Sequence, residues 1–154
     1  MPETVVCIGA IVKKESRVLL VRQAVGHSLA GQWTIPWGRL ERGESAAAAA
    51  IREVMEESGL VAEVEGLLGV QELPSRWQGW LAIVYQCQHV SGETVPDGRE
   101  TDAARYFSEE EIDSLAEPIE PWSEWLVRRV FSGNVTITRS GDPTNPFGAS
   151  VGFV

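Results

Sequence analysis

The chain is poor in positive charge and has no long apolar run. Of its 154 residues, 13 are Lys or Arg and 22 are Asp or Glu, which gives a net charge of −9 at pH 7. That charge repels phosphate backbones and anionic lipids, so we expect no stable binding to nucleic acid and no membrane attachment. No stretch approaches the roughly 20 apolar residues of a membrane-spanning helix. The first four residues also lack the pattern of a secretory leader, so we expect a cytoplasmic protein.

Cysteine and histidine are equally scarce, with two of each. Cys7 and Cys87 lie in apolar, strand-like contexts. This is typical of buried thiols in a reducing compartment rather than of a disulfide or a metal pair. His27 and His89 are far apart in the sequence, so a histidine metal site has little support. The sequence therefore favours oxygen ligands for any metal that the protein binds.

The length and the patterning predict one mixed α/β domain. A chain of this size can bury a single substantial core. We expect this domain to cover residues 1–133, followed by a glycine- and proline-rich tail at 134–154 that packs on the domain or extends it. Strands are expected at 4–12, 17–22, 33–35, 62–73, 80–89 and 104–107, with 135–138 as a further edge strand. Helices are expected at 46–58, 108–115 and 121–131. The second should begin with a capping box formed by Ser108 and Glu111, and the third should stop at Gly133, with Trp122 and Trp125 in the core.

The most informative segment begins at Gly38 and ends at Leu60. Glu44 follows six positions after Gly38, and seven residues later the chain reads Arg-Glu-Val-Met-Glu-Glu-Ser-Gly-Leu over 52–60. Ser45 is a suitable N-cap for a helix here, and the glycine at 59 is a suitable C-cap. The segment therefore predicts a loop at 36–43, then a helix, then a closing turn.

Three carboxylates share one face of this helix. At about 100° per residue, Glu53, Glu56 and Glu57 fall within an arc of roughly 100°. Ala46 and Ala49 project into the same arc, where their short side chains would leave room for a metal ion and phosphate oxygens. The opposite face should meet a core through Ala47, Ile51, Val54 and Met55. Carboxylates this close repel one another, so the arrangement favours a divalent metal with oxygen ligands.

A cation is also present on this helix. Arg52 lies one turn before Glu56, where it can hold that carboxylate and offset part of the repulsion. A solvated acidic surface is the ordinary explanation of a glutamate-rich helix. Here many positions carry a fixed residue type at a fixed spacing, which disfavours that explanation.

The spacing from Gly38 through Glu44 to residues 52–60 resembles the signature of the Nudix hydrolases at every specified position. The resemblance implies an α/β/α sandwich, with a mixed sheet flanked by the motif helix and by C-terminal helices. It also implies hydrolysis of a nucleoside diphosphate linked to another group. One departure is Trp37, which stands where relatives commonly have glycine and could narrow the entrance or stack on a base.

The resemblance further implies Mg²⁺ or Mn²⁺ held chiefly by Glu53, Glu56 and Glu57, often with the backbone carbonyl of Gly38. Such ions would neutralise phosphate oxygens and acidify a bound water, whose proton a carboxylate accepts. Glu53 and Glu57 are the best candidates for the ligand and base roles, and the sequence leaves open which is the base. Glu44 either joins the metal site or braces the loop.

Charged residues outside the motif are further candidates. The acidic loop at 97–102 offers Glu100 and Asp102, which are either part of the site or solvated acids in a turn. Arg22, at a strand end, and Arg76, in a loop, are the cations that we expect to meet phosphate. The alternative for both arginines is an ordinary surface ion pair.

Aromatic residues could supply base stacking. Trp33 and Trp37 flank the loop that enters the predicted metal site, so we expect both to line the pocket. Trp77 and Trp80 lie in or beside a later loop that could also reach the substrate.

Together these features predict a metal-dependent pyrophosphohydrolase that acts on a nucleotide or a nucleoside-diphosphate derivative. Two alternatives remain open: a pyrophosphatase that removes oxidised nucleoside triphosphates, and a nucleotide-sensing module without turnover. Removal of pyrophosphate from RNA ends is disfavoured, because the chain lacks basic patches. Many relatives pair, so a homodimer is an option that the sequence leaves open.

Overall fold

A computed structural model of the chain describes residues 3–74, 79–133, 144 and 146. In chain order the elements are β1 (Val5–Lys14), β2 (Arg17–Gln23), β3 (Trp33–Thr34), β4 (Trp37–Arg39), α1 (Ala46–Ser58), β5 (Val61–Glu72), β6 (Trp80–Ser91), β7 (Thr101–Phe107), α2 (Glu109–Asp113) and α3 (Pro121–Ser132). Arg76, Trp77 and the predicted strand at 135–138 lie outside the described residues. The division between the domain and its tail stays a prediction.

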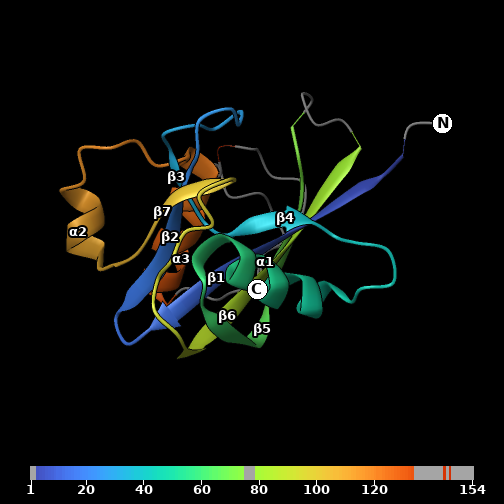
Figure 1. The fold of residues 1–154 in the computed structure, drawn as a ribbon, viewed down its shortest axis with the longest axis horizontal. Coiled ribbons are helices and arrows are strands. Elements are labelled where there is room, and N and C mark those ends of the chain that lie inside the picture. Colours follow the sequence, from blue (N-terminus) through green and yellow to red (C-terminus); the bar gives the residue numbers. More distant parts are fainter. Residues whose placement is uncertain (1–2, 75–78, 134–143, 145, 147–154) are drawn as a thin grey trace.

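The strands form one mixed sheet in the order β3-β2-β1-β6-β5, with β4 paired to β1 and β7 paired to β2. β1 and β6 are parallel, and the other neighbours are antiparallel. Two helices, α1 and α3, cover opposite faces of this sheet (Figure 1). Successive side chains of a strand point to opposite faces. Ile8 and Ala10 therefore pack on the α1 side, whereas Ile11 packs on the α3 side. The predicted α/β/α sandwich is confirmed.

Helix α1 has the predicted ends but a different buried face. Ser45 Oγ accepts a hydrogen bond from the Ala48 N–H at 3.1 Å, and Gly59 ends the helix with a φ of 75°. Glu53 and Glu57 lie on the buried face, together with Ala49, Ala50 and Val54.

The predicted core face of α1 was therefore largely wrong. Only Val54 is buried, whereas Met55 is 44% exposed and Ala47 and Ile51 are half-buried. Ala49, expected to leave room in the site, packs in the core instead, and Ala46 packs against it. The alanines let the helix lie close to the sheet, and this contact carries the two glutamates inward.

The segment before α1 also differs from the expected loop. Trp37–Arg39 forms strand β4, which pairs with β1 so that Gly38 lies opposite Ile8. So short a strand gives no period-2 signal in the sequence, and its pairing depends on the distant β1. The consequence is that residues 37–39 are fixed in the sheet beside α1.

The remaining elements follow the expected local rules. Ser108 and Glu111 form a capping box at α2, and Gly133 ends α3 in the left-handed conformation. Trp122 is buried in the core, with Trp125 packed against it. Cys7 and Cys87 are buried free thiols, as predicted. Within the described residues, none of the helices combines the length and the apolar character needed to cross a membrane.

Candidate active site

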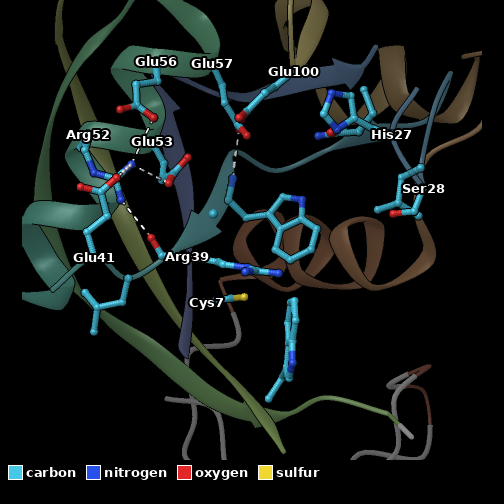
Figure 2. A pocket seen from close by; sticks show the side chains of 16 residues that line it. Cys7, His27, Ser28, Arg39, Glu41, Arg52, Glu53, Glu56, Glu57 and Glu100 are labelled. Carbon is cyan, nitrogen blue, oxygen red and sulfur yellow. Dashed lines mark hydrogen bonds and ion pairs between the residues drawn. The ribbon is translucent and has the colours of Figure 1, made fainter. Parts of the chain in front are cut away.

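A cleft of about 760 Å³ opens where α1, β4 and two loops meet. The loops are the one that follows β2 and the one that precedes β7. Figure 2 shows the cleft with its glutamates on one side and His27 and Ser28 on the other. The walls are formed by Cys7, Gln23, His27, Ser28, Leu29, Trp37, Gly38, Arg39, Leu40, Glu41, Arg52, Glu53, Glu56, Glu57, Trp80 and Glu100.

Three carboxylates converge at one end of this cleft. Glu53, Glu57 and Glu100 each place one oxygen within 4.8 Å of the others. Glu53 and Glu57 are 5% and 2% exposed, whereas Glu100 is exposed. Glu57 also accepts a hydrogen bond from the backbone N–H of Trp37 at 3.1 Å. Clustered oxygen donors of this kind suit a hard divalent cation.

Gly38 leaves the space that the Glu53 carboxylate occupies. A Cβ atom built at position 38 would overlap all three atoms of that carboxyl group. The Gly38 backbone does not have a positive φ, so the need for glycine here is one of space and not of backbone conformation. The residue that opens the motif therefore makes room for a glutamate fifteen positions later.

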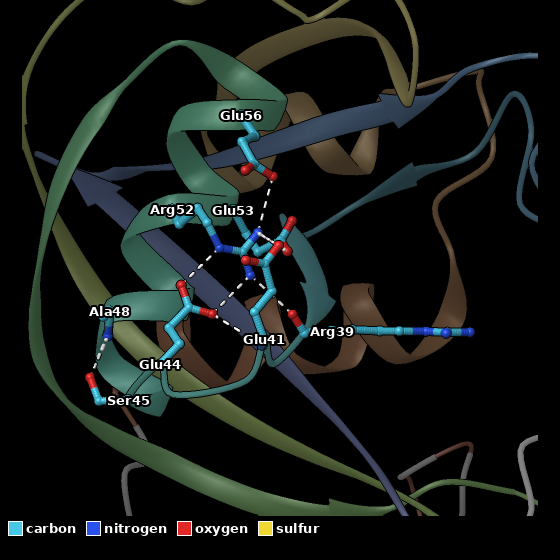
Figure 3. Close-up of polar contacts among 8 residues, drawn as sticks. All are labelled: Arg39, Glu41, Glu44, Ser45, Ala48, Arg52, Glu53 and Glu56. Atoms are coloured by element: carbon cyan, nitrogen blue, oxygen red, sulfur yellow. Dashed lines mark hydrogen bonds and ion pairs between the residues drawn. The ribbon is translucent and has the colours of Figure 1, made fainter. Parts of the chain in front are cut away.

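Arg52 joins the helix to the preceding loop (Figure 3). Its guanidinium donates to Glu44 at 2.8 and 3.1 Å, to Glu53 at 2.7 Å and to Glu56 at 3.1 Å. It also donates to the backbone carbonyl of Arg39 at 3.0 Å. Glu44 lies outside the three-carboxylate cluster and accepts a hydrogen bond from the Glu41 N–H at 3.2 Å. Of the two roles considered for Glu44, the structure supports bracing of the loop.

The loop that carries Glu100 is organised by Asp97. One oxygen of Asp97 accepts backbone hydrogen bonds from residues 99, 100 and 101 at 2.8, 2.9 and 3.0 Å. The Thr101 hydroxyl then donates to the backbone carbonyl of Glu57 at 2.7 Å. These contacts fix Glu100 next to the end of α1. This role of Asp97 was not predicted from the sequence, although Asp-Gly is a recognisable turn signal.

Burial changes the proton affinity of the two inner glutamates. It raises the pKa of Glu53 to about 7, against the opposing effect of Arg52. Burial and the neighbouring Glu53 also raise the pKa of Glu57 well above its usual range. Without a cation these carboxyl groups tend to hold protons near neutral pH. A bound divalent ion would replace those protons, and this fits the donor set to a metal.

Trp33 and Arg22, both predicted to bind substrate, do not line the cleft. The expectation that Trp33 lines the pocket was therefore wrong, and a phosphate contact of Arg22 stays a prediction. Trp33 is 5% exposed and packs edge-on against Phe107, with a centroid separation of 5.0 Å. Arg22 forms ion pairs with Asp102 at 2.7 Å and with Glu117 at 2.9 Å. The pairing of β2 with β3 and β7 directs both side chains away from the cleft. This also excludes Asp102 from the acidic cluster.

Other predicted residues do reach the cleft. Trp37 and Glu100 are part of its walls, as is Trp80. Arg39 lines the cleft too and was missed, because its only sequence signal is its place next to Gly38. His27 ties the two loops together, with a ring nitrogen 3.1 Å from the Arg99 carbonyl oxygen.

Comparison with known proteins agrees with the family that the motif resembles. The family model for the NUDIX domain matches residues 2–130. An ADP-ribose pyrophosphatase of Methanocaldococcus jannaschii is 30% identical over 113 residues, which are 72% of this chain and 66% of that protein. An NAD-capped RNA hydrolase, NudC, of Salmonella heidelberg is 29% identical over 139 residues, which are 90% of this chain and 51% of that protein. The chain thus spans between half and two thirds of the length of these two curated relatives.

Solved structures agree with the observed fold. The crystal structure of a NUDIX hydrolase from Nitrosomonas europaea superposes with a TM-score of 0.76 at 25% sequence identity. The match covers 87% of this chain and 73% of that one.

Proposed function

The chain belongs to the Nudix hydrolase family, and from that premise we propose that it is a divalent-metal-dependent pyrophosphohydrolase. Its substrate would be a nucleotide or a nucleoside-diphosphate derivative, cleaved at a phosphoanhydride bond. The observation that supports this most strongly is the convergence of Glu53, Glu57 and Glu100 beside Gly38.

Glu53 and Glu57 would hold the metal, Mg²⁺ or Mn²⁺, with Glu100 from the facing loop and the Gly38 carbonyl. Glu56, whose side chain is half exposed, would contribute from the rim. When bound, the ions neutralise phosphate oxygens and acidify a coordinated water.

The chain's own groups have separate tasks in this scheme. A carboxylate beside the bound metal would accept the proton of the attacking water. Glu53 and Glu57, the two buried carboxylates of the cluster, are the candidates for this role. Arg52 limits the repulsion between Glu53 and Glu56 and keeps Glu53 in place. Trp37, which lines the cleft, would narrow the access to these groups.

Relatives guide the choice of substrates for a test. The ADP-ribose and NAD cap in the names of the two relatives both contain a nucleoside diphosphate linked to another group. We therefore propose an assay of ADP-ribose, NAD⁺ and nucleoside triphosphates with and without Mg²⁺. Mg²⁺-dependent release of a nucleoside monophosphate supports the enzyme. Tight nucleotide binding without turnover of any compound would instead indicate a sensing module. A homodimer and a cytoplasmic location stay predictions.

Metal should stabilise the protein more at pH 8 than at pH 5.5. The pKa of Glu53 in the folded protein is raised to about 7, so its protonated side chain favours the folded state. This contribution to the free energy of unfolding is complete below the ordinary pKa of 4.5. That contribution is lost as the pH rises through about 7, at a cost on the order of 3 kcal/mol. Glu57 shifts in the same direction.

The measurement is urea denaturation at both pH values, in EDTA and in excess Mg²⁺. Stability in EDTA should fall from pH 5.5 to pH 8, and Mg²⁺ should remove most of the fall. The fall in stability should be smaller in Glu53→Gln. His89 cannot cause the fall, because its lowered pKa makes the stability rise with pH. Equal Mg²⁺ stabilisation at the two pH values would contradict this prediction.

Asp97 should control metal affinity indirectly. It is not itself a proposed ligand, but it holds the loop that carries Glu100. Asp97→Ala removes the acceptor of three backbone hydrogen bonds, so we expect Mn²⁺ to bind about tenfold more weakly. Asp97→Asn keeps an acceptor oxygen and should restore most of the affinity. Asp102→Ala is the matched control, because Asp102 pairs with Arg22 outside the cluster. Calorimetric Mn²⁺ titration decides, and unchanged binding in Asp97→Ala would show that the loop holds its shape without this carboxylate.

A further inference from the structure

Away from the carboxylate cluster, the cleft contains a pair formed by Arg39 and Trp80. The guanidinium carbon of Arg39 lies 4.8 Å from the ring centroid of Trp80. Arg39 ends β4 and Trp80 begins β6, and both strands pair with β1. A guanidinium held over an indole ring is restrained by that contact, while its N–H groups stay available to another partner.

Among the described residues that line the cleft, Arg39 is an arginine that no carboxylate engages. Arg52, the other arginine in the cleft walls, is engaged by Glu44, Glu53 and Glu56. Within the described part of the chain, the Arg39 guanidinium forms neither a hydrogen bond nor an ion pair, and it lies over the Trp80 ring. In a chain of net charge −9, this cleft rich in glutamate leaves the Arg39 guanidinium as an available positive group.

The backbone and the side chain of Arg39 serve opposite sides of the cleft. Its carbonyl accepts the hydrogen bond from Arg52, whereas its side chain points away from the Arg52 network (Figure 3). Cys7, its partner across the β1–β4 ladder, provides no negative charge there, because burial raises the pKa of the thiol to about 11. The cleft is therefore negative at the glutamates and positive at Arg39.

We propose that Arg39, oriented by the Trp80 ring, binds a phosphate group of the substrate that does not lie at the carboxylate cluster. The guanidinium edge suits two phosphate oxygens at once, and the contact with the ring limits the entropy lost on binding. The ligand class is an organic diphosphate or triphosphate, with one phosphate at the glutamates and another at Arg39. This inference rests on the proposed function for the first of those positions only.

The kinetic test compares Arg39→Gln with Arg42→Gln. Arg42 lies in the same segment, is exposed and does not line the cleft, so its variant loses the same charge nearby. For whichever phosphoanhydride the wild type hydrolyses, Arg39→Gln should raise KM at least about tenfold, with kcat within about threefold. Arg39→Lys should recover part of the affinity, and Arg42→Gln should stay within about twofold of wild type. Equal KM values in the two Gln variants, or a loss of kcat at constant KM, would overturn the proposal.

Calorimetric binding of ADP and of adenosine in Mg²⁺ separates this inference from the proposed function. If the wild type binds ADP without hydrolysing any compound, the proposed function fails. A tenfold loss of ADP affinity in Arg39→Gln would still support the phosphate site. If Arg39→Gln weakens ADP and adenosine equally, the pair recognises the base and the proposal is wrong.

The contribution of Trp80 is tested in the same experiment. Trp80→Phe keeps an aromatic face and should bind ADP within about threefold of wild type. Trp80→Leu removes that face and should weaken ADP binding more than threefold in the wild-type background. It should cause no further loss when it is added to Arg39→Gln, because the side chain that the ring orients is then absent. Additive losses in the double variant would show that Trp80 does not act through Arg39.

Discussion

Glu57→Gln should nearly abolish turnover and at the same time make the metal-free protein more stable. Glu57 is 2% exposed and lies within 4.8 Å of oxygens of Glu53 and Glu100, so its charge is poorly tolerated without a cation. An amide oxygen can still accept the hydrogen bond from Trp37, and the amide N–H groups can donate to the neighbouring carboxylates. The fold should therefore accept the change.

We expect kcat to fall by about 10²–10⁴-fold, the range typical of a lost general base or metal-binding carboxylate. In EDTA at pH 8 the free energy of unfolding should rise by about 1–2 kcal/mol, because a repulsive buried charge is gone. Mg²⁺ should stabilise this variant less than the wild type. Steady-state kinetics and urea denaturation provide both readings.

The matched control is Glu63→Gln, an exposed glutamate on β5. This change should alter neither activity nor metal-dependent stability. A Glu57→Gln enzyme with more than a tenth of wild-type kcat would remove Glu57 from the catalytic machinery. A metal-free variant less stable than wild type would show that the carboxylate is structural.

Gly38→Ala should cost activity by displacing Glu53 and not by straining the backbone. The new Cβ would overlap the Glu53 carboxyl group, which must then leave its position beside Glu57. A displacement of about 1 Å at a catalytic group can cost about 10²-fold in rate, and we expect a loss of that size with weaker Mg²⁺ binding. Overpacking should also lower the free energy of unfolding by about 1–2 kcal/mol.

A double-variant cycle identifies the route of this effect. If Gly38→Ala acts through Glu53, adding it to Glu53→Gln should reduce activity little beyond the effect of Glu53→Gln alone. Gly66→Ala is the control, since a Cβ at position 66 meets open space and that backbone has no positive φ. Fully additive losses in the cycle would place the effect of Gly38 elsewhere in the site.

Both predicted effects are large because the residues placed for catalysis do not also stabilise the fold. Glu53 and Glu57 occupy the buried face of α1, where apolar residues would stabilise the fold better. Arg52 offsets part of the cost of burying the Glu53 carboxylate. The Glu57 carboxylate accepts one hydrogen bond in the described structure, from the Trp37 N–H. An acidic site of this kind is suited to bind a cation, and a bound metal would then contribute to stability as well as to chemistry.

Local sequence rules accounted for much of the fold. The caps of α1 at Ser45 and Gly59, the capping box of α2 and the glycine stop of α3 are interactions within a few residues, and all were predicted. Burial of Cys7 and Cys87 followed from their apolar contexts. The motif also identified Glu53, Glu56 and Glu57 as neighbours, because helical spacing fixes their relative directions.

Contacts between distant segments could not be derived in this way. Helical periodicity says which residues share a face of α1, but the sheet decides which face is buried, and it selected the one with Ala49, Glu53 and Glu57. The same limit applies to Trp33 and Arg22, whose directions depend on how β2 pairs with β3 and β7.

The sequence by itself determined the family, the acidic helix and the ends of the helices, because each depends on residue identity at short spacing. Only the tertiary structure decided that Glu100 joins Glu53 and Glu57, that Gly38 gives Glu53 its space, and that Arg39 lies on Trp80. These arrangements join segments between 15 and 47 positions apart. Packing of the helix and the loops on the sheet brings such segments together, and a one-dimensional pattern does not encode those distances.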